Sequence, residues 1–421
     1  MSHPAFTLLH TSDWHLGRGF HGRRPESMFA AFLDWLLTTL AAQEVDALLV
    51  AGDVFDSQTP TPRMQALYYR FLARLTAQGR CRHVVITAGN HDSPAFLDAP
   101  RQLLAALNVH VIGTAKDAPE EEVLTLRAPD GTPELIVCAV PYLHERDLRR
   151  ALPDESTADK ERRLAEGIHA HYAAVARAAS EQRAALGAAG EHVPIVAMGH
   201  LFAAGASTVE DDGVRSLYVG SLAHVGADTF ADAFDYVALG HLHRAQCVAG
   251  QAHIRYSGAP QVMGFGEAGQ EKSVCLVRWQ GRTPEVRTLP VPCFQPMARL
   301  QGDETALAPE LARLAALDAP VWLEIRYTGT LAPAEIQHWL HERTADSALD
   351  ILRLHHQGLT AQALAPEAEG EALESLDAEN VFARLLEQQH IAEDDRAELW
   401  RSYRELLDAM AADETGTGGV L

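Results

Sequence analysis

Residues that bind metal ions recur over the first 243 positions of this 421-residue sequence. Each group follows a short apolar run, and several groups contain a glycine just before the polar residue. In chain order the groups are Asp13 and His15 in "HTSDWHLGR", Asp53 in "AGDVFD", Asn90, His91 and Asp92 in "AGNHDS", His200 in "MGH", and His241 and His243 in "LGHLH". Carboxylate, imidazole and amide groups without thiolate are typical ligands of Mn²⁺, Fe or Zn²⁺.

No single group is specific for a metal. Asp-X-His often lies in an ordinary turn, and Asp after Gly is a common turn former or helix N-cap. The pair His241 and His243 is stronger evidence, because alternate side chains of an extended chain point to the same side. All five groups in one chain, each at the end of a predicted strand, predict a metal site.

The size of the set indicates two ions rather than one. Two ions about 3.5–4 Å apart, with one carboxylate bridging them, would use all these ligand types. Such a pair polarises a phosphoryl group and lowers the pKa of a bridging water, so we expect phosphoester hydrolysis.

Short apolar strands alternating with amphipathic helices must bring these groups together. Strands are predicted in "TLLHTSD", "DALLVAGD", "HVVITAGN", "NVHVIG", "ELIVCAVPY", "PIVAMGH" and "YVALGH", and helices at 26–43, 62–79 and 155–190. The alternation predicts an α/β fold with helices covering both faces of the sheet, and such sheets bind ligands at the carboxyl ends of their strands. The later runs "HIRYSG", "SVCLVRW" and "EVRTLPV" predict an antiparallel addition.

The length of the chain favours several domains over one compact core. We expect a catalytic domain over 1–291 and a small β-α-β-α-β domain over 292–360. An acidic linker over 361–374, two short amphipathic helices over 375–412 and a disordered tail over 413–421 would follow. Helices this short are rarely stable alone in water, so they should either pack on their own domain or dock on a partner.

Composition limits the function classes. The net charge of −22 argues against a broadly DNA-binding surface, although residues 361–421 carry half of it and local fields matter more than the sum. We find no apolar stretch of about 18 residues and no secretion signal. Five cysteines without short spacing fit a reducing compartment, so we expect a cytoplasmic protein with no membrane segment.

The order of the five motifs resembles the calcineurin-like metallophosphoesterase superfamily. The segments "LLHTSDWHLGR", "VDALLVAGDVFD", "ALGHLHRAQ" and "VPCFQPMARLQGD" resemble its branch of bacterial exonuclease subunits, the SbcD family. The resemblance covers essentially the whole chain. It implies a metallophosphoesterase β-sandwich flanked by helices, a small α/β capping domain and C-terminal helices that bind a partner.

The resemblance also implies roles for individual residues. It assigns Asp13, His15 and His243 to one ion, Asn90, His200 and His241 to the second, and Asp53 to both. His91 would be a catalytic general acid or phosphate-contacting residue, with Asp92 beside it as a second catalytic residue. We expect Asp56 and His10 to support the site without binding metal, and Trp14 to pack in the core.

By the same resemblance, the metal would be Mn²⁺, and ATP would enter only through an SMC-like ATPase partner of the SbcC type. The implied activities are an ATP-dependent double-strand exonuclease and a single-strand and hairpin endonuclease. They would act in DNA repair, recombination and replication at the nucleoid, by a homodimer within a heterotetramer. The rivals are a phosphatase on the same metal core and a non-catalytic scaffold.

Contacts with DNA and partner are less well specified. Arg18 and Arg244, which follow the first and last motifs, are the candidate DNA-binding residues. The candidate partner-binding residues are Phe382, Leu385, Leu386, Trp400, Tyr403 and Leu407. The apolar side of helix 62–79 predicts either a homodimer face or a helix buried on its own sheet.

Overall fold

The computed structural model describes residues 6–148, 156–203, 225–230, 232–317, 319–356 and a few positions beyond 381. Contacts divide the chain into two units. The first contains Met1–Arg299 with Pro320–Trp322, and the second contains Leu300–Ala319 and Leu323–Leu421. Within the described ranges, no helix is long and apolar enough to cross a membrane.

The first sheet of the first unit has the strand order β12-β11-β1-β2-β3-β4. Its strands are β1 (Thr7–Thr11), β2 (Ala47–Ala51), β3 (His83–Thr87), β4 (Val109–Ile112), β11 (Lys272–Gln280) and β12 (Thr283–Val291). Strands β1 to β4 are parallel, whereas β11 is antiparallel to both β1 and β12. The predicted antiparallel addition is therefore confirmed for β11 and β12.

The second sheet has the order β5-β6-β7-β8-β10-β9. Its strands are β5 (Val123–Arg127), β6 (Pro133–Ala139), β7 (Ile195–His200), β8 (Tyr236–Gly240), β9 (Gln246–Val248) and β10 (Gln251–Tyr256). The antiparallel prediction is wrong for β10, which pairs parallel with β8 and antiparallel with β9. The turn between β9 and β10 reverses the chain, so that β10 runs in the direction of β8.

The two sheets pack face to face. The core between them contains Leu8, Leu49 and Val85 from the first sheet and Val137, Val196 and Ala238 from the second. The prediction of one sheet covered by helices on both faces is therefore wrong, whereas the sandwich that the family resemblance implies is confirmed. The central strands are buried on both faces, and such a strand has the same apolar sequence whether a helix or a sheet covers it.

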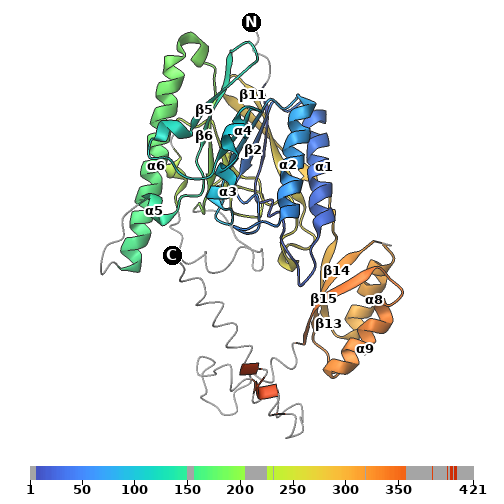
Figure 1. The fold of residues 1–421 in the computed structure, drawn as a ribbon. Helices are drawn as coiled ribbons and strands as arrows, with labels where there is room; N and C mark the ends of the chain where they lie inside the picture. Colours follow the sequence, from blue (N-terminus) through green and yellow to red (C-terminus); the bar gives the residue numbers. More distant parts are fainter. Residues whose placement is uncertain are drawn as a thin grey trace. The chain divides into compact units, whose positions relative to one another are not determined.

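Helices cover the outer faces of the sandwich. The neighbouring helices α1 (Glu26–Ala42) and α2 (Pro62–Gln78) lie on one side in Figure 1, and α6 (Thr157–Ala185) lies on the other. Helix α6 buries Tyr172 and Val175 against the second sheet and is shorter than predicted, because a 3₁₀ turn follows it. Three short helices, α3 (Pro94–Asp98), α4 (Arg101–Ala105) and α5 (Glu145–Leu148), lie in the connections.

The apolar side of α2 packs inside its own unit. Tyr68, Phe71, Leu72 and Leu75 are at most 3% exposed. Burial under the fold accounts for these residues, and the homodimer face stays a prediction.

Residues 297–356 have the predicted β-α-β-α-β order, and most of them belong to the second unit. They form β13 (Met297–Gly302), α8 (Glu304–Ala315), β14 (Val321–Tyr327), α9 (Pro333–Thr344) and β15 (Leu349–His356), with the sheet order β13-β14-β15. Asp303 caps α8 by accepting hydrogen bonds from the backbone N–H groups of Thr305 and Ala306.

Three of the candidate partner-binding residues contact one another. The ring of Phe382 stacks on Tyr403 at 3.9 Å between centroids and meets the edge of Trp400 at 5.1 Å. The predicted contacts Leu385, Leu386 and Leu407, the linker over 361–374 and the tail over 413–421 lie outside the described residues.

Candidate metal centre

The predicted ligand residues lie at strand ends from both sheets. Asp13 and His15 follow β1, Asp53 follows β2, Asn90 follows β3, His200 ends β7, and His241 and His243 follow β8. These strands are neighbours in the two sheets, β1-β2-β3 in one and β7-β8 in the other. The carboxyl ends of the two sets of parallel strands therefore meet at one edge of the sandwich.

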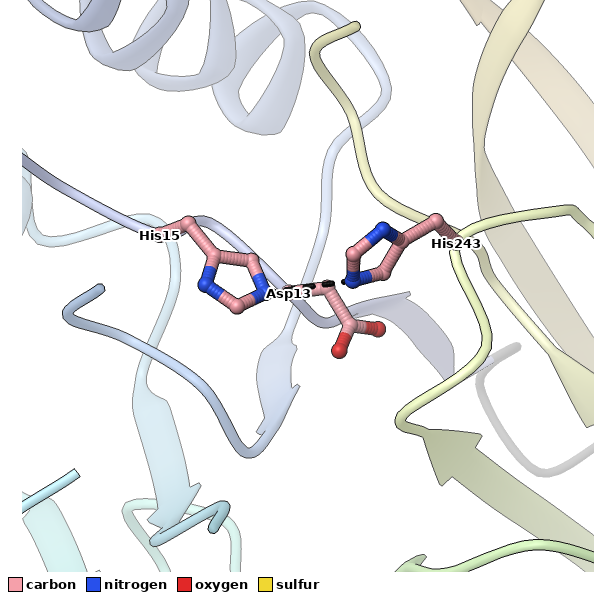
Figure 2. A group of neighbouring side chains, drawn as sticks. All are labelled: Asp13, His15 and His243. Carbon is pink, nitrogen blue, oxygen red and sulfur yellow. Dashed lines mark hydrogen bonds between the residues drawn. The ribbon is translucent and has the colours of Figure 1, made fainter. Parts of the chain in front are cut away.

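The first cluster contains Asp13, His15 and His243. The Nε2 atoms of the two histidines lie 3.2 Å apart, and the three candidate ligand atoms lie within 4.8 Å of one another. Figure 2 shows the two rings facing each other from separate loops, with the Asp13 carboxylate beside them. Two buried imidazole nitrogens and a carboxylate at one point fit a divalent cation.

The second cluster contains Asn90, His200 and His241. Asn90 Oδ1 lies 3.1 Å from His200 Nε2 and 3.1 Å from His241 Nδ1. Asp53 Oδ2 lies between the clusters, 3.5 Å from His15 Nε2 and 3.3 Å from His200 Nε2. The structure thus brings all seven predicted ligands together, with Asp53 in the shared position.

Four of these residues have unusual backbone conformations. The φ angles of Asp13, His15, Asp53 and His241 are +53°, +43°, +52° and +100°. A left-handed conformation costs a non-glycine residue about 1–3 kcal/mol and persists only where its surroundings impose it. Here the backbone N–H of Asp13 donates to the Gly52 carbonyl oxygen, and that of His15 donates to the Asp53 carbonyl oxygen, both at 3.0 Å.

Two glycines leave the space in which the side chains converge. Gly52 has a φ of +84°, and a Cβ atom there would lie 2.2 Å from His200 Nδ1. A Cβ atom at Gly89 would lie 2.1 Å from Asp53 Oδ1. The glycines that precede the motifs therefore permit the close approach that the sequence predicted.

Oxygen atoms lie near the ring nitrogens that face away from the clusters. His15 Nδ1 lies 3.2 Å from Asp56 Oδ1, and His243 Nδ1 lies 3.4 Å from Glu267 Oε1. His200 Nδ1 lies 2.9 Å from the Ala51 carbonyl oxygen. Such contacts fix the tautomer and orientation of a metal-binding imidazole. Asp56 was expected in this role, whereas Glu267 was missed, and its one sequence signal is the glycine-rich stretch "MGFGE" after the last motif.

Burial and charge set the protonation of the cluster. Burial lowers the pKa of His15, and burial together with the His200 charge lowers the pKa of His241 to about 3. Burial opposes the charge on Asp53, but the adjacent His200 outweighs it and holds the carboxyl pKa well below its usual range. Burial opposes the charge on His200, but the adjacent Asp53 outweighs it and raises the imidazole pKa to about 9. The charged Asp53 and the neutral His15 and His241 are in the forms that bind a cation, whereas His200 must lose its proton to do so.

His91 lies beside both clusters. Its backbone N–H donates to Asp53 Oδ1 at 2.9 Å, and its ring meets the His15 ring at 4.9 Å between centroids. The side chain is half-buried. This position fits a residue that contacts the substrate next to the ions.

Asp92 has different surroundings. It is buried, and its carboxylate accepts the backbone N–H groups of Val54, Phe55 and Gly89 at 3.1, 2.8 and 2.9 Å. Burial, with the Asp53 charge, raises the carboxyl pKa to about 7. These contacts connect the loops after β2 and β3, so the geometry supports a positioning role rather than the predicted catalytic role.

The candidate DNA-binding arginines differ from each other. Arg18 Nε donates to the Met263 carbonyl oxygen at 3.0 Å, and Nη1 donates to Asp56 Oδ1 at 3.2 Å. Arg18 is therefore engaged inside the protein. Arg244 is exposed and lines a cavity of about 350 Å³ beside His243, where a DNA contact stays a prediction.

His10 and Trp14 are structural, as expected. Both side chains are fully buried. His10 Nδ1 lies 3.0 Å from the Tyr236 hydroxyl and Nε2 lies 3.2 Å from the Leu239 carbonyl oxygen, while the Trp14 ring packs edge-on against Phe32.

The sandwich and its strand-end clusters define a metal-dependent phosphoesterase. The family model for the calcineurin-like phosphoesterase matches residues 6–245, and a model described as the type 5 capsule protein repressor C-terminal domain matches residues 293–390. The SbcD component of nuclease SbcCD from Escherichia coli K12 is 36% identical over 413 residues, which cover 96% of this chain and 99% of that protein. The protein of the same name from Rhodobacter capsulatus is 38% identical over 319 residues, which cover 74% and 75%.

The chain belongs to the SbcD family of nuclease components within the calcineurin-like phosphoesterases. It is a metal-dependent phosphodiester hydrolase, and its buried cluster of nitrogen and oxygen atoms is a candidate site for divalent ions.

Proposed function

We propose that this chain is the nuclease subunit of an SbcC–SbcD-type complex and hydrolyses DNA phosphodiester bonds with two Mn²⁺ ions. The main support is the position of Asp53 Oδ2, which lies 3.5 Å from His15 Nε2 in one cluster and 3.3 Å from His200 Nε2 in the other. One carboxylate that reaches both clusters suits a bridging ligand of two ions.

In this proposal Asp13, His15 and His243 hold one ion, Asn90, His200 and His241 hold the other, and Asp53 bridges them. The bound ions would supply charge to polarise the phosphoryl group and to activate water. The chain itself supplies the geometry, because strained backbone and buried loops position the ligands.

His91 is the proposed general acid. Asp53 fixes its main chain by accepting its N–H, and the half-buried ring lies at the side of the cluster that substrate can reach. A proton delivered from the imidazole to the 3′-oxygen would assist departure of the leaving strand. Asp92 contributes by holding the loops that carry Asp53 and His91.

The proposed substrates are double-stranded ends, hairpins and single strands, with ATP-dependent exonuclease and endonuclease action in repair and recombination at the nucleoid. The net charge of −22 suits a subunit whose ATPase partner supplies much of the DNA contact. A homodimer within a heterotetramer is the proposed assembly, with the Phe382–Trp400–Tyr403 rings near the partner contact.

A comparison of substrates tests the proposal. The chain, with and without its SMC-like ATPase and ATP, is incubated with Mn²⁺ and either a labelled DNA hairpin or nitrophenyl phosphates. We expect hairpin cleavage that increases with the ATPase and ATP. Hydrolysis confined to the small phosphates would instead show a phosphatase, and no hydrolysis of either substrate by the complete complex would show a scaffold.

A further inference from the structure

The loop between β10 and β11, residues 257–271, carries a carboxylate that has no place in the proposed ligand set. Glu267 is 1% exposed, and its Oε1 lies 3.4 Å from His243 Nδ1. Its Oε2 accepts from Lys272 Nζ at 2.6 Å and from the Met263 backbone N–H at 2.9 Å. Lys272 Nζ also donates to the His243 carbonyl oxygen at 3.3 Å. Glu267 and Lys272 together therefore hold both the ring and the main chain of His243.

The same arrangement occurs behind His15. Asp56 Oδ1 lies 3.2 Å from His15 Nδ1 and also accepts from Arg18 Nη1 at 3.2 Å. Both histidines of the first cluster thus have a carboxylate on the side away from the cluster. Each of these carboxylates is paired in turn with a cationic side chain.

The two pairs are joined through one residue. Arg18 Nε donates to the Met263 carbonyl oxygen at 3.0 Å, and the Met263 N–H donates to Glu267. A continuous set of contacts therefore runs from Asp56 through Arg18 and Met263 to Glu267 and Lys272. It connects the loop after β2 with the loop before β11.

The second cluster is supported differently. His200 Nδ1 faces the neutral carbonyl of Ala51 at 2.9 Å rather than a carboxylate. A carboxylate that accepts from Nδ1 increases the basicity of the metal-binding nitrogen more than a carbonyl does. The two ion positions consequently differ in how strongly their imidazoles are oriented and polarised.

We propose that Glu267 and Lys272, joined through Met263 to Arg18 and Asp56, form a positioning network that makes the Asp13–His15–His243 position the tighter of the two ion sites. The inference rests on the two-ion site of the proposed function. In this proposal none of the network residues binds an ion, and each acts on the ion position through His15 or His243. Partners of this kind contribute about 10–100-fold to metal affinity.

Mn²⁺ binding by the full chain, followed by titration calorimetry and by electron paramagnetic resonance of free Mn²⁺, tests the network. We expect two classes of site in the wild type. Glu267→Gln should weaken the tighter class about 10–100-fold and leave the weaker class unchanged. Glu271→Gln, the same substitution at an exposed position of the same loop, is the matched control and should bind as the wild type does.

Two further variants guard against a folding defect. Glu267→Gln combined with Lys272→Met avoids an unpaired buried cation. Arg18→Gln changes the part of the network behind His15, at a side chain that is partly exposed. Both should weaken the same tighter class, while thermal unfolding of the metal-free variants shows that they fold. Unchanged tight binding in the folded variants would overturn the network alone. A wild-type chain that binds no Mn²⁺ would overturn the proposed function itself.

Discussion

The two sheets of the sandwich contribute different chemistry to the metal centre. The loops of the first sheet carry the oxygen donors Asp13, Asp53 and Asn90 with one imidazole, His15, whereas the second sheet contributes only the imidazoles of His200, His241 and His243. Each cluster therefore combines residues from both sheets. As a result, both clusters depend on the packing between the sheets, and ions bound in them would link the sheets.

Direct contacts also join the two sheets at this edge. The backbone N–H of His241 donates to Asp13 Oδ1 at 3.0 Å, and His10 of β1 contacts Tyr236 and Leu239 of β8. These protein contacts therefore help to position the clusters. Substitutions and metal removal can separate what bound ions contribute to activity and stability from what the protein contacts contribute.

Loss of the residue shared by both clusters should have the largest effect. In Asp53→Asn the bridging charge is absent, and a metal contribution of several kcal/mol corresponds to a fall in DNA cleavage of about 10³-fold. Mn²⁺ binding should weaken at both positions in the same titration. Asp34→Asn on α1, which is 58% exposed, is the control and should cleave normally. Full activity of Asp53→Asn would refute the bridging role.

Substitution of His91 should affect catalysis without affecting the metal binding that links the two sheets. His91→Ala should lower single-turnover DNA cleavage about 10²-fold, because a general acid is lost. Because His91 is outside the ligand set, Mn²⁺ affinity and the metal-dependent rise in melting temperature should stay at wild-type values. Retained cleavage would exclude His91 as the general acid.

Metal removal should lower the free energy of unfolding of the sandwich. An ion that binds only the folded chain stabilises it by about 2.7 kcal/mol when its concentration is 100 times the dissociation constant. We expect Mn²⁺ to raise the free energy of unfolding of the chelator-treated chain by about this amount per site. His243→Ala, which removes the contribution of the second sheet to one position, should reduce the gain. Equal denaturant midpoints with and without Mn²⁺ would show that the ions do not link the sheets.

Substitution of His10 should give the smallest effect per pH unit, and this effect needs no metal. Burial lowers its pKa from 6.5 to about 3, so the folded chain keeps it neutral while the unfolded chain protonates it. Unfolding therefore takes up a proton, and stability from this residue decreases by about 1.4 kcal/mol per pH unit as pH falls from about 6.5 to about 3. Denaturant unfolding of the metal-free chain should show a smaller pH slope in His10→Gln. Identical slopes would contradict a neutral buried His10.

Sequence patterns predicted the elements with long, strongly apolar or periodic stretches. Helices α1 and α2 and the strands that carry the ligands lie where expected, because a fully buried strand must be apolar throughout. Strands β5 and β9 were missed, since they lie at the edges of the second sheet and are only partly apolar. The sequence could not predict whether a helix or a second sheet covers a given sheet face, because both pack against the same apolar residues.

The sequence by itself determined which residue types stand at the strand ends and therefore the chemistry of the centre. Local patterns could do this because each ligand lies at or just after the end of a short, largely apolar strand. Only the tertiary structure decided which of them meet: His15 and His243 are 228 positions apart and face each other across the sandwich at 3.2 Å. It also decided that Asp92 holds backbone amides and that Glu267 supports His243. Such pairings depend on how the two sheets pack, and no local pattern encodes that packing.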